Sequence, residues 1–169
     1  MTGSPSFERM RFALGPRNPV AAGVTRYAGT THRQFDMHYE LELGIVLRGR
    51  VRRYSGPDFH YDIGVGEPWF CGIWEPHGVR IRQAPCDVLV LVIWPPFLAG
   101  LRFDSAPEVN WTSLFATPAA DRPRVPKGKR RDLVAKAKTI GRLSRAEAAH
   151  QTLRLRWAVL ELLLLVMEA

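Results

Sequence analysis

The chain has few cysteines and no long apolar run, and each shortage excludes a class of protein. It holds only Cys71 and Cys86 in 169 residues. They form no CxxC pair and have no partner at zinc-finger spacing, so we expect neither a disulfide scaffold nor a finger. No apolar run approaches the roughly 20 residues that span a bilayer. The N-terminus also lacks the apolar centre of a signal peptide. We therefore expect a cytoplasmic protein without a membrane partner.

Acidic residues are scarce in one segment, which concentrates the positive charge there. The chain has 24 Lys and Arg against 16 Asp and Glu, a net charge of +8. Ten basic residues and one acid lie between Arg122 and Arg145, and the remainder is close to neutral. This distribution argues against a protein that binds nucleic acid over its whole surface. The segment is either a solvated helix face or a local contact for phosphates.

Turn residues divide the chain into four parts. Residues 1–20 read as an irregular arm, because proline, glycine and serine are frequent there. Residues 21–98 alternate short apolar strands with Gly and Pro turns, one of them at Arg48 and Gly49. The strands are expected at 39–47, 51–54, 59–63, 69–74, 79–81 and 88–94. Residues 99–126 form a proline-rich connection, and 127–169 are helical. The pattern predicts a mainly β fold, a sandwich or barrel followed by C-terminal helices.

Two helices are expected after Pro126. The first covers 132–143, and a capping box at Ser144 and Glu147 predicts that the second begins there and runs for about 24 residues. The second helix carries two apolar stripes: Leu153, Trp157, Leu160, Leu164 and Met167 form one, and Leu155, Val159, Leu162 and Val166 the other. One stripe is enough to dock a helix on its own domain. The second stripe therefore predicts a homodimer, with burial in the chain's own core as the alternative. The helix has no stop signal before Ala169, so we expect the natural protein to continue.

Polar residues recur at even positions around one predicted strand. Asp36, His38, Glu40 and Glu42 share one face, and the leucines and isoleucine between them and beyond share the other. Burying three carboxylates and an imidazole together is costly unless they hold a cation or a polar ligand. The pattern thus predicts a binding site on this face.

These residues carry a resemblance to a known superfamily. Asp36-x-His38-x3-Glu42-x6-Gly49 resembles the first cupin motif, with Asp36 in place of its first histidine. Gly66, followed by Gly72, Trp74 and His77, resembles the second motif. The resemblance implies a single cupin-like double-stranded β-helix (jelly-roll) barrel. It also implies a divalent metal, iron, manganese, nickel or zinc, on Asp36, His38, Glu42 and His77. The alternatives are a hydrogen-bonded polar pair or direct binding of a polar ligand.

The whole chain is similar to the ligand-binding and dimerisation half of AraC-type transcriptional regulators. The stretch FDMHYELELGIVLRGRVRRY resembles their H-x3-E segment, and an arm, a barrel and a helix pair follow the same order. The resemblance implies a small-molecule effector, a sugar or a small carboxylate, and DNA binding only through a C-terminal domain absent from this sequence. The effector-binding residues expected are His38, Glu40, Glu42, Trp74, His77 and Tyr27. The alternative is a metal-dependent cupin enzyme, an isomerase or dioxygenase acting on a small polar substrate.

Overall fold

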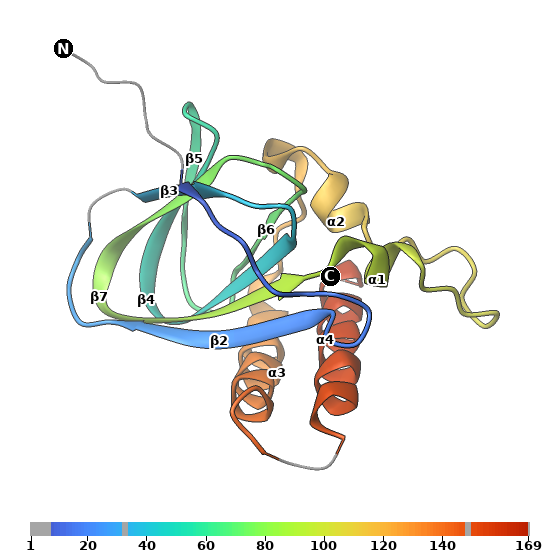
Figure 1. Cartoon of the computed structure of the whole chain (residues 1–169). Coiled ribbons are helices and arrows are strands. Elements are labelled where there is room, and N and C mark those ends of the chain that lie inside the picture. Colours follow the sequence, from blue (N-terminus) through green and yellow to red (C-terminus); the bar gives the residue numbers. More distant parts are fainter. Residues whose placement is uncertain (1–7, 32–33, 148–149, 169) are drawn as a thin grey trace.

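The computed structural model describes residues 8–31, 34–147 and 150–168. A curled antiparallel sheet forms the N-terminal part, and two long helices pack beneath it (Figure 1). The strands are β1 (Glu8–Arg9), β2 (Val20–Tyr27), β3 (Gln34–Met37), β4 (Leu41–Ser55), β5 (Phe59–Ile63), β6 (Pro68–Cys71) and β7 (His77–Ile93). The helices are α1 (Pro95–Ala99), α2 (Ser113–Ala116), α3 (Arg130–Leu143) and α4 (Gln151–Met167), with short 3-10 turns at Ala119–Asp121 and Lys127–Lys129.

Two long, bent strands close the sheet into a barrel. The first half of β4 pairs with β6 and with the second half of β7. The second half of β4 pairs with β5 and with the first half of β7. β2 extends one half of the barrel and β3 the other. The predicted architecture, a mainly β barrel followed by C-terminal helices, is confirmed.

The expectation of six short strands is wrong in two places. Arg48 and Gly49 do not form a turn: they lie inside β4, where the pairing with β7 shifts register between Val46 and Val51. Gly49 has a φ of 79°, and a Cβ there would collide with the backbone of β7. A glycine at a bulge bends a strand without ending it. The segments expected at 79–81 and 88–94 likewise belong to one strand, β7, which ends at Ile93.

Side chains on the two faces of β4 pack into two different apolar cores. Leu41, Leu43 and Ile45 belong to a large core that the sheet shares with the helices. On the opposite face, Val46 and Val51 join a smaller core inside the barrel, with Trp69 and Cys71 of β6. One face of the strand thus anchors the helices, and the other faces the barrel interior where Glu42 also lies.

The last helix begins later than its predicted capping box. Ser144 ends α3 instead: its backbone N–H and its hydroxyl bond to carbonyls of the last turn of that helix. α4 begins at Gln151, whose side-chain amide donates to the carbonyl of Leu143. Ser144 can either begin a helix or end one. Here it ends α3, and α4 packs against α3 after the turn that follows. In the described ranges no helix combines the length and apolar character needed to cross a bilayer.

The arm is not wholly irregular. Glu8 and Arg9 form β1, which pairs in parallel with β3. Farther along, the carbonyls of Pro16 and Arg17 accept hydrogen bonds from Arg156 of α4. The arm therefore connects the edge of the barrel to the helices, and it passes close to the polar cluster described next.

Candidate metal centre

Two buried histidines meet inside the barrel, and each is oriented by a backbone carbonyl. His38 lies in the turn between β3 and β4, and its Nδ1 is 2.9 Å from the carbonyl oxygen of Glu40. His77 is the first residue of β7, and its Nδ1 is 2.7 Å from the carbonyl oxygen of Glu75. Each side chain is 1% exposed, and the ring centroids are 4.9 Å apart. Because a carbonyl can only accept, both Nδ1 atoms donate, and in the neutral ring Nε2 carries the free lone pair.

Glu42 completes the group. It lies on β4, and its Oε2 is 3.5 Å from His38 Nε2 and 3.6 Å from His77 Nε2. Its other oxygen, Oε1, accepts hydrogen bonds from Arg53 Nη2 at 2.6 Å and from Trp69 Nε1 at 2.7 Å. The carboxylate is therefore held by one oxygen and presents the other to the two imidazoles.

The electrostatics favour an ionised Glu42. Burial opposes ionisation, but the positive charge of Arg53 and the interactions with His38 and His77 together outweigh it and hold the pKa of Glu42 well below its usual range. Burial also opposes a charge on His77. The Cys71 sulfur and the carboxylates of Asp36 and Glu42 act in the other direction and raise the pKa of His77. Negative groups thus converge on this point of the interior, and a positive charge placed among them is stabilised.

The donor set fits a divalent transition metal. One ligand atom from each of His38, Glu42 and His77 lies within 4.8 Å of the others, and all three residues are buried. His38 Nε2 is also a buried atom without a well-formed hydrogen bond to any described residue. Two imidazoles and one carboxylate suit iron, manganese, nickel or zinc. Carbonyl bonds on the far ring nitrogens are the usual outer shell of metal-bound histidine.

The other expected ligands and binding residues lie around this group at varying depth. Asp36, on β3, places Oδ1 2.6 Å from His77 Nε2 and is part-exposed, so it lies at the rim on the His77 side. Glu40 is buried with its carboxylate 3.8 Å from His38 Nδ1, in the turn rather than on a shared strand face. Tyr27 packs on the interior core, and burial raises the pKa of its hydroxyl. Trp74 points outward: it is 49% exposed and lies against Tyr39.

The sequence did not predict three residues that surround Glu42 in the structure. Arg53 and Trp69 bind Glu42, and the Cys71 sulfur lies 2.8 Å from Arg53 Nη2. Arg53 is one of four arginines in the stretch RGRVRR. It differs from its part-exposed neighbour Arg52 only in that its side chain points into the barrel. Cys71 and Glu42 are directly paired across β6 and β4, a contact that requires the register.

The arm covers the His38 side of the group. The Phe12 ring lies edge-on to the imidazole of His38, with 5.2 Å between ring centroids. Met10 is bonded through its backbone N–H to the carbonyl of Met37, one residue before His38. Access from solvent on this side therefore requires movement of the arm.

Comparisons with solved structures return, among their matches, several structures of one enzyme. No protein-family model matches the chain, and no curated protein matches it. Solved structures of Bacillus subtilis oxalate decarboxylase are similar to part of it. One comes from work on the Mn(II) centres of that enzyme and another was determined at pH 4.6, each at 18% identity and a TM-score of 0.40. Each comparison covers 45% of this chain and 21% of that chain, so this chain spans about a fifth of the length of the structures it matches.

Proposed function

We propose that this chain is a metal-binding sensor domain, the effector-binding and dimerisation part of an AraC-type transcriptional regulator. The observation that carries the proposal is the buried group of His38, Glu42 and His77, whose ligand atoms converge while both Nδ1 atoms and Glu42 Oε1 are held by hydrogen bonds. In the proposed role, a divalent metal held by these residues supplies a Lewis-acidic position for an oxygen atom of the effector. DNA binding would belong to a domain outside this sequence.

Burial of the group supports sensing. His38, Glu42 and His77 are at most 7% exposed, and the Phe12 ring lies over His38. An effector that approaches from the His38 side must displace the arm, so on that route occupancy and arm position are coupled. A ligand shifts such an equilibrium only through different contacts in the two states. The side chains of Asp36 and Glu40 are placed to bind hydroxyl groups of a sugar, whereas a small carboxylate would need the metal charge.

The metal site gives the first prediction. The chain should bind one equivalent of Co²⁺, Mn²⁺, Ni²⁺ or Zn²⁺ and unfold at a higher temperature, since a ligand at 100 times its dissociation constant adds about 2.7 kcal/mol of stability. His77→Ala and Glu42→Gln should each weaken binding at least about 100-fold, more than the loss of an outer-shell partner. Isothermal titration with each metal measures both effects.

The control separates a built site from adventitious binding. His60 is exposed on β5, outside the group, so His60→Ala should bind metal as the unchanged chain does. If His60→Ala weakens binding as much as His77→Ala, or if the unchanged chain takes up no metal, the site assignment fails.

The exposed end of α4 supports homodimerisation. Of the first stripe, Leu153 and Trp157 are 52% and 58% exposed, whereas Leu160 is buried in the chain's own core. The second stripe, Leu155, Val159, Leu162 and Val166, is buried against the sheet and α3. The part of the helix that can serve a partner is therefore its first two turns. Adjacent exposed Leu and Trp side chains favour a protein contact there.

Trp157→Glu should convert a dimer to a monomer, because a charge on this stripe would be buried without a partner in the interface. Sedimentation velocity over a range of protein concentrations measures the change. Ala135→Glu, at an exposed position of α3, is the matched control and should remain dimeric. A wild-type chain that sediments as a monomer at high concentration contradicts the interface.

A cupin enzyme is the second candidate, and the ligand set favours it. Two histidines and one carboxylate with open positions are the set used by non-haem iron oxygenases. The two functions differ in the fate of the small molecule. A sensor's effector raises the unfolding temperature of the metal-loaded chain and is recovered unchanged, whereas an enzyme's substrate is consumed.

A further inference from the structure

A cleft outside the metal group opens between the barrel and the short helices. Its volume is about 560 Å³, within the range of small-molecule sites. Its walls are apolar residues of α1, α2 and the β6–β7 connection, chiefly Pro95, Ala99, Phe115, Ala116 and Ile73. Ile73 is 48% exposed, so an apolar side chain faces open space beside the cleft.

The polar floor of the cleft consists of a saturated ion pair. Arg122, from the proline-rich connection, makes hydrogen bonds with all five of its N–H groups. They go to both oxygens of Glu75 and to the carbonyls of Thr117, Phe70 and Phe115. Glu75 accepts two further bonds, from the Ser55 hydroxyl at 2.6 Å and from the Gly72 N–H at 2.8 Å. The floor thus has no unused charge and no unused strong donor.

A floor of this kind selects its ligand by exclusion. A charged molecule would lose its hydration without gaining an ionic partner, which is costly. An uncharged apolar molecule loses nothing on the floor and gains contact with the walls. The threonines of the cleft add little, because the Thr117 hydroxyl donates to the carbonyl of Ser113 and the Thr112 hydroxyl to Asn110.

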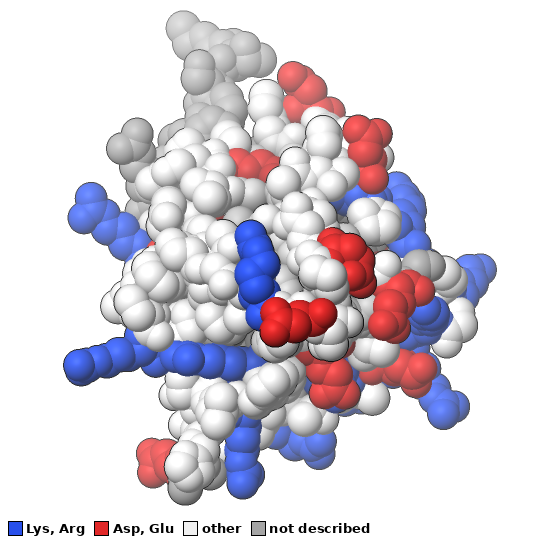
Figure 2. Space-filling view, turned by 90° about the vertical axis from the view of Figure 1, so that its right-hand side faces the viewer, with Lys and Arg blue, Asp and Glu red and all other residues white. Residues whose placement is uncertain are grey.

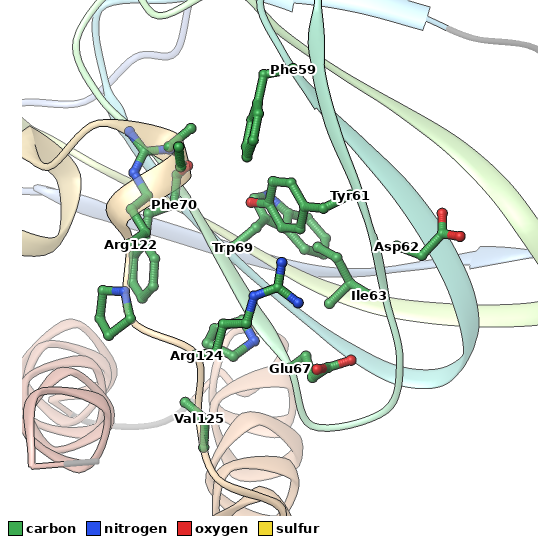
Figure 3. Close-up of a pocket in the computed structure, with 14 residues that line it drawn as sticks. Phe59, Tyr61, Asp62, Ile63, Glu67, Trp69, Phe70, Arg122, Arg124 and Val125 are labelled. Carbon is green, nitrogen blue, oxygen red and sulfur yellow. Dashed lines mark hydrogen bonds between the residues drawn. The ribbon is translucent and has the colours of Figure 1, made fainter.

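The surroundings agree with an uncharged ligand. Figure 2 shows the side of the molecule that carries α1 and α2 in Figure 1: acidic and basic side chains are interspersed there between broad uncharged areas. A neighbouring pocket, between β5, β6 and the connection, holds only about 40 Å³. There the Arg124 guanidinium lies over the Tyr61 ring (Figure 3), and the space suits water rather than an organic ligand.

We propose that the cleft bounded by Ile73, Pro95, Ala99, Phe115 and Ala116 binds an uncharged, mainly apolar small molecule. This site is separate from the metal group, since none of His38, Glu42 and His77 lines it. It is nonetheless connected to that group: Glu75 holds Arg122 through its carboxylate and His77 through its carbonyl.

The test uses the uncharged fluorophore N-phenyl-1-naphthylamine and the full 169-residue chain. The probe should bind with one-to-one stoichiometry. Ala99→Trp and Ala116→Trp place an indole in the cleft from two different helices, and each should weaken probe binding at least about tenfold, because the space is filled. Both positions are exposed, so the variants should fold, which circular dichroism verifies.

Ala135→Trp adds the same indole on the exposed face of α3 and should leave probe affinity within about twofold. His38→Ala, which should lose metal, should also retain the probe, so failure of the metal site and failure of the cleft are distinguishable. Three results overturn the proposal: no saturable binding by the unchanged chain, equal affinity in both cleft variants and the unchanged chain, or loss of the probe in Trp157→Glu with the cleft variants unaffected. The last result would place the probe on the α4 stripe.

Discussion

Arg53→Met should lower the free energy of unfolding by about 3–5 kcal/mol, the usual cost of removing one partner from a buried ion pair. Arg53 and Glu42 have side-chain exposures of 5% and 9%, and Nη2 lies 2.6 Å from Oε1. Methionine fills most of the space but leaves Glu42 Oε1 buried without its charged partner, with the uncharged donors Trp69 and Cys71. Arg53 also lies over the Trp69 ring, 5.0 Å from its centroid, and that contact is lost as well. Urea unfolding of the metal-free chain measures the change.

Two further variants make the result specific to the buried charge. Arg52→Met changes the adjacent arginine, which points to the opposite face and pairs with Asp62 at the surface. It should have a much smaller effect, because surface pairs contribute little. The double variant Arg53→Met with Glu42→Gln should recover part of the loss, since no carboxylate is then left unpaired. If the double variant is as unstable as the sum of its parts, lost packing rather than the stranded charge explains the effect.

The contrast between Arg52 and Arg53 shows what the sequence alone can predict. Motif spacing named His38, Glu42 and His77, and the structure brings their ligand atoms together. Glu42 and His77 are not paired in the sheet, since Glu42 pairs with Val92 and His77 with Ser55, so they meet across the barrel interior. The same spacing did not reveal Arg53, since its role depends on a bulge that sets the phase of β4 eleven residues after Glu42. A sequence motif specifies the spacing of its own residues. The residues that contact a buried carboxylate depend instead on how a long strand bends, which the motif does not specify.

The same limit applies to the helical end of the chain. The two apolar stripes of the last helix were visible, but the sequence did not separate Leu160, which is buried, from Trp157, which is exposed. The separation depends on where the helix begins. Ser144 and Glu147 satisfied a local capping rule, yet tertiary packing placed the start at Gln151.

Gly44→Ala should lower the free energy of unfolding by about 3 kcal/mol. The substitution adds only one methyl group, at a position of β4 that has no functional side chain. Gly44 and Trp69 are directly paired across β4 and β6, and the indole ring occupies the space where a side chain at position 44 would lie. A Cβ at position 44 would overlap the Trp69 ring. Overpacking a well-filled core costs about 1–3 kcal/mol. Displacing the indole also breaks its hydrogen bond to Glu42, and a bond to a charged group contributes about 1.5–3 kcal/mol.

Gly23→Ala is the matched control, because Gly23 also lies within a strand, β2, and a Cβ there would meet nothing within 4 Å. It should leave stability unchanged or raise it by about 0.5–1 kcal/mol, since glycine within a strand has excess freedom in the unfolded chain. Gly44→Ala should in addition weaken Co²⁺ binding, because Trp69 no longer holds the Glu42 carboxylate toward the histidines. Urea unfolding and titration calorimetry of both variants test the two effects separately. A Gly44→Ala chain as stable as the Gly23→Ala chain would show that Trp69 can move without cost, and that Arg53 alone positions Glu42.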